Sequence, residues 1–309
     1  MKYNRLYLFL TILYSALHLL DPNALFSLDL VSVEGGSFVM GHSNPNMLGK
    51  GETKDETPPH TVNITNNFSI SKTEITLKDA VKVYNYGIKN NIISVTDGLL
   101  LLAKGDTQLL LPVDNIQEIK ITNEKLVLEK GKEDIPVYGV TWYGAVVFCN
   151  LLSRMENRLE CYSLSNWQLK AVTGGYRLPT EAEWAFACRG GIKSRGYRYS
   201  GANTPGVVSW YIVNSLGVPR KVARKRANEL GLYDMSGNMW EWCNDYYSKK
   251  YYVTSPVDNP KGPESGFLRV VRGGSGYSYK QGLRITHRYS YLPAAHHSTL
   301  GFRVVLQNK

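Results

Sequence analysis

Cysteine is scarce in this chain. The 309 residues include only 4 cysteines, and their spacings match no zinc-binding pattern, which excludes a zinc-stabilised fold. Disulfide formation in an oxidising compartment stays open, although Cys149 and Cys188 lie on apolar faces of expected helices, where a buried thiol is favoured. The cysteines are Cys149, Cys161, Cys188 and Cys243.

Long apolar runs are also lacking, and only the N-terminus is a candidate for membrane contact. Lys2 and Arg5 precede an apolar run at residues 6–20, which is short for a transmembrane helix but suits the apolar part of an export signal. We therefore expect residues 1–27 to be an export signal or an N-terminal anchor. We expect no other membrane span, and an exported protein that is periplasmic, on the cell surface or secreted.

Positive charge is in excess but is not concentrated as in a nucleic-acid-binding protein. The net charge is +10, and basic residues cluster only between Arg220 and Arg226. No nucleic-acid module accompanies this cluster, so we interpret it as a solvated loop and expect no specific nucleic-acid binding. An anionic partner stays open.

The composition, with 43% hydrophobic residues and 28 glycines, is that of a globular chain with a sizeable core. Alternating apolar and polar residues predict half-buried strands within 31–41 and 60–75. The stretch 92–136 differs, because Gly105-Asp106 and Asn123 interrupt apolar or alternating runs as hairpin turns do. We expect a small β-rich insertion there, with partner binding as the alternative role.

Three helices are predicted, each behind a threonine that can cap its N-terminus. In the third, Thr180 and Glu183 have the spacing of a capping box, in which each side chain bonds the other residue's backbone N–H. Trp184, Ala187 and Cys188 should form its buried side. The expected helices run from Leu77 to Asn90-Asn91, from Trp142 to about Asn157, and from Thr180 to Gly190-Gly191.

The stretch from Gly231 to Trp242, GLYDMSGNMWEW, contains turn-forming residues and a carboxylate enclosed by two tryptophans. A Glu241 anion between indoles is expensive to bury unless it has an arginine, backbone N–H groups or a metal ion. From spacing alone, a capped turn with an arginine pair is the simpler interpretation. With Asp234 as a second carboxylate, calcium is the alternative, because it binds oxygen ligands.

Five segments resemble, in the same order, the formylglycine-generating enzyme or sulfatase-modifying factor family. They are GGSFVMG, GYRLPTEAEW, GLYDMSGNMWEW, RVVRGGS and LGFRVV, and they extend over about residues 31–306 apart from the insertion. The resemblance implies an α+β fold of the C-type-lectin-like kind with little regular secondary structure. It places the family-like domain at residues 31–309, with the β-rich insertion at 92–136 inside it.

The resemblance also implies a structural calcium ion. In this family the segment that matches Asp234 to Glu241 holds calcium, and residue-by-residue comparison gives the side chains of Asp234 and Glu241 and the carbonyls of Gly237 and Met239 as ligands. On this ground we expect calcium rather than the arginine pair. A further upstream calcium site of catalytic members is not expected, because residues 210–228 contain no Asp or Glu.

The catalytic centre of the family is not matched. Catalytic members bind copper(I) through two cysteines after the segment matching Arg272 to Ser275, and they oxidise a sulfatase cysteine to formylglycine. Here no cysteine follows Cys243, and copper(I) prefers soft thiolate ligands. We expect no copper and no catalytic residue. The alternative is an oxidoreductase, either a formylglycine generator with substitute ligands or an iron-dependent oxidase variant.

The C-terminal segment instead carries tyrosine, arginine and histidine. Tyrosine and arginine often provide most of the binding energy at interfaces, so the segment predicts a surface for an unidentified protein or small-molecule ligand. The alternative is that the arginines are structural ion-pair partners and the tyrosines partly core. Of His296 and His297, at most one can face a common metal site, because neighbours on an extended segment point in opposite directions. The candidate ligand-binding residues are Ser275, Tyr277, Tyr279, Arg284, His287, Arg288, Tyr289, Tyr291, His296 and His297.

Overall fold

The structure is a computed structural model that describes residues 27–42, 54–103, 108–170 and 174–307. The predicted export signal or anchor therefore lies outside the described residues, apart from Ser27, and so does the predicted turn at Gly105-Asp106. None of the described helices is long and apolar enough to cross a membrane.

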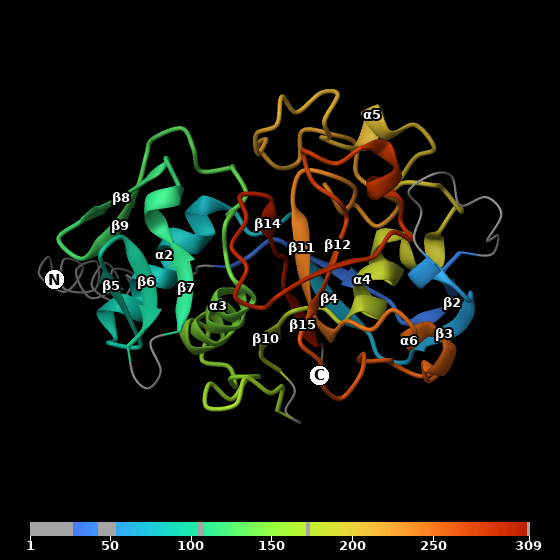
Figure 1. The fold of residues 1–309 in the computed structure, drawn as a ribbon, viewed down its shortest axis with the longest axis horizontal. Helices are drawn as coiled ribbons and strands as arrows, with labels where there is room; N and C mark the ends of the chain where they lie inside the picture. The colour runs from blue at the N-terminus through green and yellow to red at the C-terminus, as the bar shows by residue number, and fades with distance from the viewer. Residues whose placement is uncertain (1–26, 43–53, 104–107, 171–173, 308–309) are drawn as a thin grey trace, which may run out of the picture.

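Two four-stranded sheets occupy the middle of the molecule (Figure 1). The insertion and helix α2 lie at one end, and the hairpin β2-β3 with α4 and α6 lies at the other. The first sheet has the order β1 (Leu30–Val33), β4 (Phe68–Ser71), β15 (Val305–Gln307) and β10 (Tyr176–Arg177). The second has the order β13 (Tyr289–Tyr291), β12 (Arg269–Arg272), β11 (Trp240–Tyr246) and β14 (Leu300–Gly301).

The C-terminal strands complete both sheets. Strand β15 lies between β4 and β10 and is antiparallel to both, with Val305 opposite Ile70. Strand β14 pairs in parallel with β11. The end of the chain therefore joins segments that are far apart in sequence.

Each of the two predicted strand stretches contains two strands that belong to different sheets. The stretch 31–41 contains most of β1 and then β2 (Gly36–Met40), while 60–75 contains β3 (His60–Ile64) and β4. Strands β2 and β3 pair with each other, whereas β1 pairs with β4. The chain changes sheet at Gly35, where a Cβ atom would lie 2.5 Å from the Ile64 carbonyl oxygen.

The three predicted helices are confirmed. Thr76 and Thr180 each form a capping box, with Asp79 and Glu183 respectively, and the Thr141 hydroxyl accepts the Gly144 N–H. The expectation of a one-sided buried face on α4 was too narrow, because every residue of this helix except Glu183 is buried. The helices are α2 (Leu77–Lys89), α3 (Trp142–Met155), α4 (Glu181–Cys188), α5 (Pro205–Val208) and α6 (Tyr251–Thr254), with short 3-10 turns η2 (Lys54–Glu56), η3 (Val113–Asn115), η4 (Gly191–Lys193) and η5 (Lys280–Leu283).

The stretch 92–136 forms a three-stranded sheet and a two-stranded hairpin. The hairpin turns at Asn123 and Glu124, whose φ angles are +49° and +57°, as Asn123 predicted. A further turn at Asp97-Gly98 connects β5 and β6. The sequence interpretation missed it, although Asp-Gly is a typical hairpin turn. Apolar residues of this stretch share one core with α2 and α3. Its strands are β5 (Ile93–Thr96), β6 (Leu99–Leu102), β7 (Leu109–Pro112), β8 (Ile119–Thr122) and β9 (Lys125–Leu128).

All four cysteines are buried free thiols, so no disulfide forms. Burial raises the pKa of each thiol, to about 12 for Cys188. Thiolates at these positions are therefore strongly disfavoured near neutral pH.

The basic cluster is only partly solvated. Lys225 and Arg220 pack on the Trp210 ring, at 4.1 and 5.8 Å from its centroid. Arg224 is exposed and lies 3.5 Å from the Asp134 carboxylate. The cluster lies in a loop, as interpreted from the sequence. Two of its cations, Arg220 and Lys225, pack on the Trp210 ring and are therefore not fully solvated.

Candidate functional site

The ten predicted binding residues do not share one surface. Part of the segment is buried in ion pairs, part lies beside an exposed apolar loop, and part forms a row of aromatic rings at a sheet edge. The buried members are Ser275, Arg284, His287 and Arg288, and the outer members are Tyr277, Tyr279, Tyr289, Tyr291, His296 and His297.

Arg284 and His287 lie against Glu56 of η2. The Arg284 guanidinium donates to both Glu56 oxygens, at 2.7 and 2.6 Å, and His287 Nδ1 lies 3.4 Å from Oε1. Burial by itself would raise the pKa of Glu56, but the hydrogen bonds from His287 and Arg284 hold that pKa well below its usual value. This group therefore fixes the C-terminal segment to an N-terminal turn.

Arg288 forms a second buried pair, with Glu181 at the start of α4. Its Nε and one terminal nitrogen donate to the two Glu181 oxygens at 2.7 and 2.8 Å, and Arg272 lies 3.5 Å from the same carboxylate. Burial opposes ionisation of Glu181, but Arg288 keeps its pKa below the usual value. Arg288 is 1% exposed, so it is a structural ion-pair partner and not a residue of a binding surface. The sequence had left both roles open for the arginines.

Ser275 is buried as well, in a tight turn. Its backbone N–H donates to the Ser278 hydroxyl at 2.9 Å, and its own hydroxyl accepts the Tyr277 N–H at 3.3 Å. Ser275 therefore shapes the turn that leads into the outer part of the segment.

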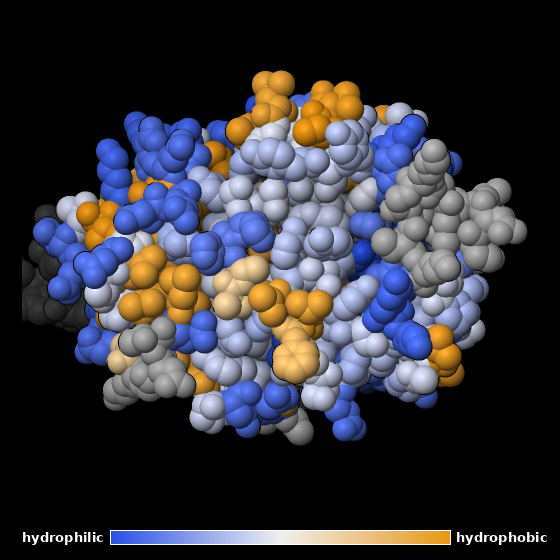
Figure 2. Space-filling view, viewed as in Figure 1, coloured by the Kyte–Doolittle hydropathy of each residue, from blue (hydrophilic) through white to orange (hydrophobic). Residues whose placement is uncertain are grey.

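Tyr277 and Tyr279 are exposed beside an apolar loop over residues 212–218. The Tyr277 ring lies against Gly217, and the Ile212 N–H donates to the Ser278 carbonyl at 3.2 Å. Figure 2 shows an apolar patch at the top of the molecule, over this part of the ribbon in Figure 1. The exposed apolar side chains of the loop are Ile212, Val213, Leu216 and Val218.

Trp240, Tyr289, Tyr291 and His297 form a row of rings in tilted or edge-on contact, which we name the aromatic ladder. Successive ring centroids are 5.6, 5.1 and 5.1 Å apart in that order. Tyr289 and Tyr291 project from the same face of β13 because side chains two residues apart in a strand do so.

The ladder is accessible at its outer end and anchored at its inner end. Tyr289 is 46% exposed and His297 is exposed, whereas Trp240 is 8% exposed. Tyr291 is half-buried and lies edge-on to the buried Trp242, with centroids 6.4 Å apart. Because β13 is an edge strand, this row lies at the border of the second sheet.

Trp240 was not among the predicted binding residues. The sequence Trp-Glu-Trp could have identified Trp240, because side chains alternate along a strand. Trp240 and Trp242 then lie on one face and Glu241 lies on the other. His296 is exposed and has no ring contact among the described residues, and the expectation that it and His297 point apart stays a prediction.

Glu241 is fully buried and bound by Arg303. The guanidinium donates to Oε2 and Oε1 at 2.6 and 2.7 Å, and the Trp184 indole N–H donates to Oε2 at 2.6 Å. The arginine pair that spacing suggested for Glu241 is therefore present.

Asp234 is the carboxylate of the predicted calcium set that retains a side-chain acceptor. Its Oδ2 accepts the Ala223 N–H at 2.8 Å, but its Oδ1 is buried without a hydrogen-bond partner in the described structure. Burial raises its pKa to about 6. Burial, with Asp234 and Glu241 nearby, also raises the pKa of Glu74 well above its usual value. Three carboxylates, those of Glu74, Asp234 and Glu241, therefore lie close together, and Asp234 Oδ1 has no donor among the described residues. A cation bound at this oxygen would balance the negative charge.

The described residues contain no group of three or more His, Cys, Asp or Glu side chains placed to hold a metal ion. A cation beside Asp234 would therefore depend on main-chain oxygens, for which the predicted ligands are Gly237 and Met239. The calcium ion stays a prediction.

Comparison with known families gives one match over nearly the whole chain. The model for the sulfatase-modifying factor enzyme 1-like domain matches residues 19–308. A solved structure, Treponema denticola variable protein 1, superposes with a TM-score of 0.67 and 26% sequence identity, covering 90% of this chain and 95% of that one. The α+β fold is thereby confirmed.

Curated relatives carry different names, of which two are compared with this chain. A formylglycine-generating enzyme of Streptomyces coelicolor is 29% identical over 303 residues, covering 88% of this chain and 87% of the enzyme. A serine/threonine-protein kinase pkn1 of Chlamydia caviae is 30% identical over 294 residues, covering 91% of this chain and 38% of that protein. The chain thus spans well under half the length of the kinase-named relative.

Proposed function

This chain belongs to the sulfatase-modifying factor enzyme 1-like family, and we propose that it is an exported binding domain of that family and not a generator of formylglycine. The aromatic ladder is the proposed contact surface for a protein or small-molecule ligand. Calcium beside Asp234 is proposed as a structural ion.

The state of the thiols supports the non-catalytic part of the proposal. Copper(I) binding by cysteine requires thiolates that can reach the metal and the substrate. All four thiols are buried, and burial raises their pKa values. The residues after Ser275 offer hydroxyl, amine and imidazole groups in place of thiols.

The aromatic ladder carries the binding part of the proposal. Tyr289 presents much of its ring to solvent, and Trp240 and Tyr291 hold the row in position from below. Rigid aromatic rings with polar tips provide contact area at little entropic cost, which is typical of binding hot spots. The arginines of the segment are buried in ion pairs, so the ladder, not the guanidinium groups, is the proposed contact.

The lengths of the relatives are compatible with a binding module. One relative is matched over most of its length and another over 38% of it. A domain that recurs alone and inside a longer protein is suited to recognition in more than one setting. What those whole proteins act on is not carried over to this chain.

Site-specific photo-crosslinking tests the binding surface. A photoreactive phenylalanine analogue at Tyr289 should give a discrete crosslinked product in an extract of the cell envelope, and excess unlabelled protein should compete for it. The matched control is the same analogue at Phe267, which is 89% exposed and outside the ladder. Equal products from both positions, or none from Tyr289, would move the binding surface elsewhere.

Incubation with a sulfatase-motif peptide, copper and a reductant tests the alternative. The proposal expects no aldehyde above a blank without protein, while an active formylglycine-generating enzyme run in parallel should give one. Repeated turnover by this chain would establish the oxidoreductase alternative instead.

A further inference from the structure

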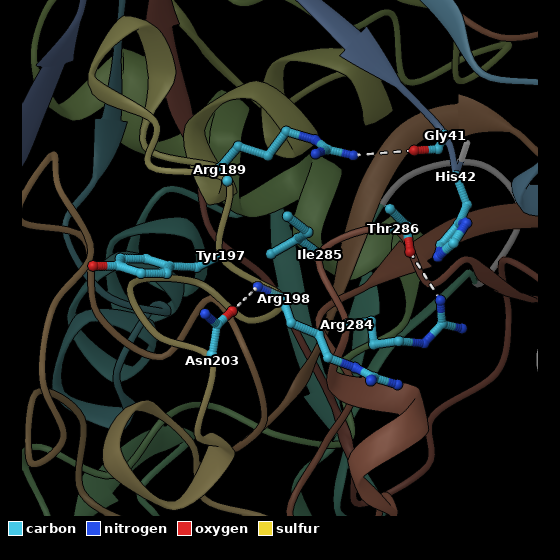
Figure 3. A pocket seen from close by; sticks show the side chains of 10 residues that line it. Gly41, His42, Arg189, Tyr197, Arg198, Asn203, Arg284, Ile285 and Thr286 are labelled. Atoms are coloured by element: carbon cyan, nitrogen blue, oxygen red, sulfur yellow. Dashed lines mark hydrogen bonds between the residues drawn. The ribbon is translucent and has the colours of Figure 1, made fainter. Parts of the chain in front are cut away.

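A cavity of about 370 Å³ lies away from the aromatic ladder, where four segments of the chain meet. Figure 3 shows the side chains of Arg189, Arg198 and Arg284 reaching toward this cavity from different elements. Among the described residues that line it, none is Asp or Glu. The lining residues are Gly41, His42, Arg189, Gly196, Tyr197, Arg198, Asn203, Arg284, Ile285 and Thr286.

Arg189 is the residue in this cavity whose charge the fold leaves least compensated. It is the C-cap of α4, and one terminal nitrogen donates to the Gly41 carbonyl at 3.3 Å. Its Nε is buried and has no hydrogen-bond partner within the described parts of the chain. Burial, with Arg272 nearby, lowers the pKa of Arg189, as expected of a buried cation with no carboxylate beside it.

The Glu56 carboxylate, which pairs with Arg284 of the lining, is not among the groups that shift the pKa of Arg189. Both oxygens of Glu56 accept from Arg284, and His287 lies against one of them. Arg189 is half-buried, and besides the Gly41 carbonyl its guanidinium lies 5.9 Å from the centroid of the Phe38 ring, so its charge carries a desolvation cost that no carboxylate offsets. An anion in the cavity would remove that cost.

The other groups of the lining add donors. The Asn203 side-chain oxygen accepts the Arg198 backbone N–H at 2.9 Å, so the amide NH₂ of Asn203 is the end left for a ligand. Arginine forms short, charge-assisted hydrogen bonds with carboxylate and phosphate oxygens, often in pairs. The cavity lies in the size range of small-molecule sites and exceeds a single oxyanion group.

We propose that this cavity binds a small molecule through a phosphate or carboxylate group held by Arg189, with Arg198 and Asn203 as further contacts. The rest of the ligand would lie against Ile285 and Tyr197. This site is separate from the aromatic ladder and does not depend on the proposed function.

Binding of inorganic phosphate and of acetate tests the site, with chloride at equal ionic strength as the reference. Calorimetry on the full chain should detect phosphate, acetate or both, and Arg189→Gln should weaken that binding at least tenfold, as the loss of a charge-assisted contact does. Arg195→Gln is the matched control, because Arg195 is an exposed arginine of the same loop outside the lining. It should bind as the native protein does.

Melting curves separate binding from folding. Without added anion, Arg189→Gln should melt no lower than the native protein, since it removes an uncompensated buried cation. With anion, only the native protein and Arg195→Gln should gain melting temperature. Phosphate alone or acetate alone would support the site and identify the group it prefers. No response of the native protein to either anion, or equal losses in the two variants, would overturn the proposal.

Discussion

Arg303 and Glu241 form a bidentate ion pair in which both side chains are fully buried. Arg303 also donates to the carbonyls of Ser71 at 2.8 Å and Tyr233 at 3.0 Å. One side chain near the C-terminus therefore holds together β4, the turn before Asp234 and strand β11. It also removes from Glu241 much of the acceptor capacity that a metal ion would use.

Breaking this pair should destabilise the fold strongly. Arg303→Met leaves Glu241 as an uncompensated buried anion, and we expect a loss of about 3–5 kcal/mol in the free energy of unfolding, measured by urea denaturation. The control is Arg224→Met, which removes an exposed pair and should cost less than about 1 kcal/mol. Similar losses in both variants would mean that the buried pair has no special role.

Asp234 should make stability depend on pH when calcium is removed. Its pKa is about 6 in the folded protein against an ordinary value of 3.8 for an aspartate, so the folded state holds the proton more tightly. Its contribution to stability should fall as pH rises from about 4 to about 6 and stay low above that, by on the order of 2–3 kcal/mol. Asp234→Asn cannot titrate, so in EDTA its unfolding free energy relative to the native protein should rise across this window.

Asparagine is the appropriate replacement because residue 234 has φ of +58°, which Asn tolerates better than most residues. At pH 7.5, added calcium should raise the melting temperature of the native protein and leave Asp234→Asn unchanged. If neither protein responds to calcium and their difference is flat from pH 4 to 7, both the ion and the raised pKa are refuted.

The two tyrosines of the aromatic ladder should contribute unequally to stability. Tyr291→Ala removes a half-buried ring from Trp242, Tyr289 and His297, and should cost about 1–2 kcal/mol of stability. Tyr289→Ala removes a ring that is 46% exposed and should cost less than about 1 kcal/mol. Chemical denaturation of both variants measures the difference, and a larger loss for Tyr289→Ala would contradict the described packing.

The cysteines should be unreactive in the folded protein. Ellman's reagent at pH 8 should titrate essentially no thiol in the native state and all 4 after denaturation in guanidinium, because the thiols are buried and their pKa values are raised. The comparison of native with denatured protein supplies the internal control. Rapid reaction of even one thiol in the native protein would show that it is accessible, and would contradict the argument against metal binding by cysteine.

The sequence predicted helix caps and hairpin turns well, because residues close together in the chain determine these features. Thr180 and Glu183 form their capping box within four residues, and Asn123 specifies a two-residue turn, so neither depends on the rest of the fold. The partner of Glu241 is different, because Arg303 lies 62 residues away. The sequence indicated that Glu241 needed a cation or hydrogen-bond donors. The spacing of residues, however, does not indicate which cation lies beside Glu241 in the folded protein.

The predicted binding segment shows the same limit. Composition identified its tyrosines and arginines, but only three-dimensional packing separates Arg288, held by Glu181, from Tyr289, one residue later and exposed. Residues 284–288 form no regular strand, so no periodic pattern marked which side chains point inward.

The position of β15 between β4 and β10 has a consequence for biosynthesis. While the chain is still on the ribosome, β4 and β10 lack the strand that joins them, and Glu56 and Glu181 lack Arg284 and Arg288, which are made 228 and 107 residues later. The ion pairs can therefore form only after residue 288 has been made, and the sheet can close only after residue 307 has been made. Such long-range closure is slow. A product that ends before residue 284 would lack β15, Arg284 and Arg288, so it would present unpaired strands and the unpaired acids Glu56 and Glu181 to proteases.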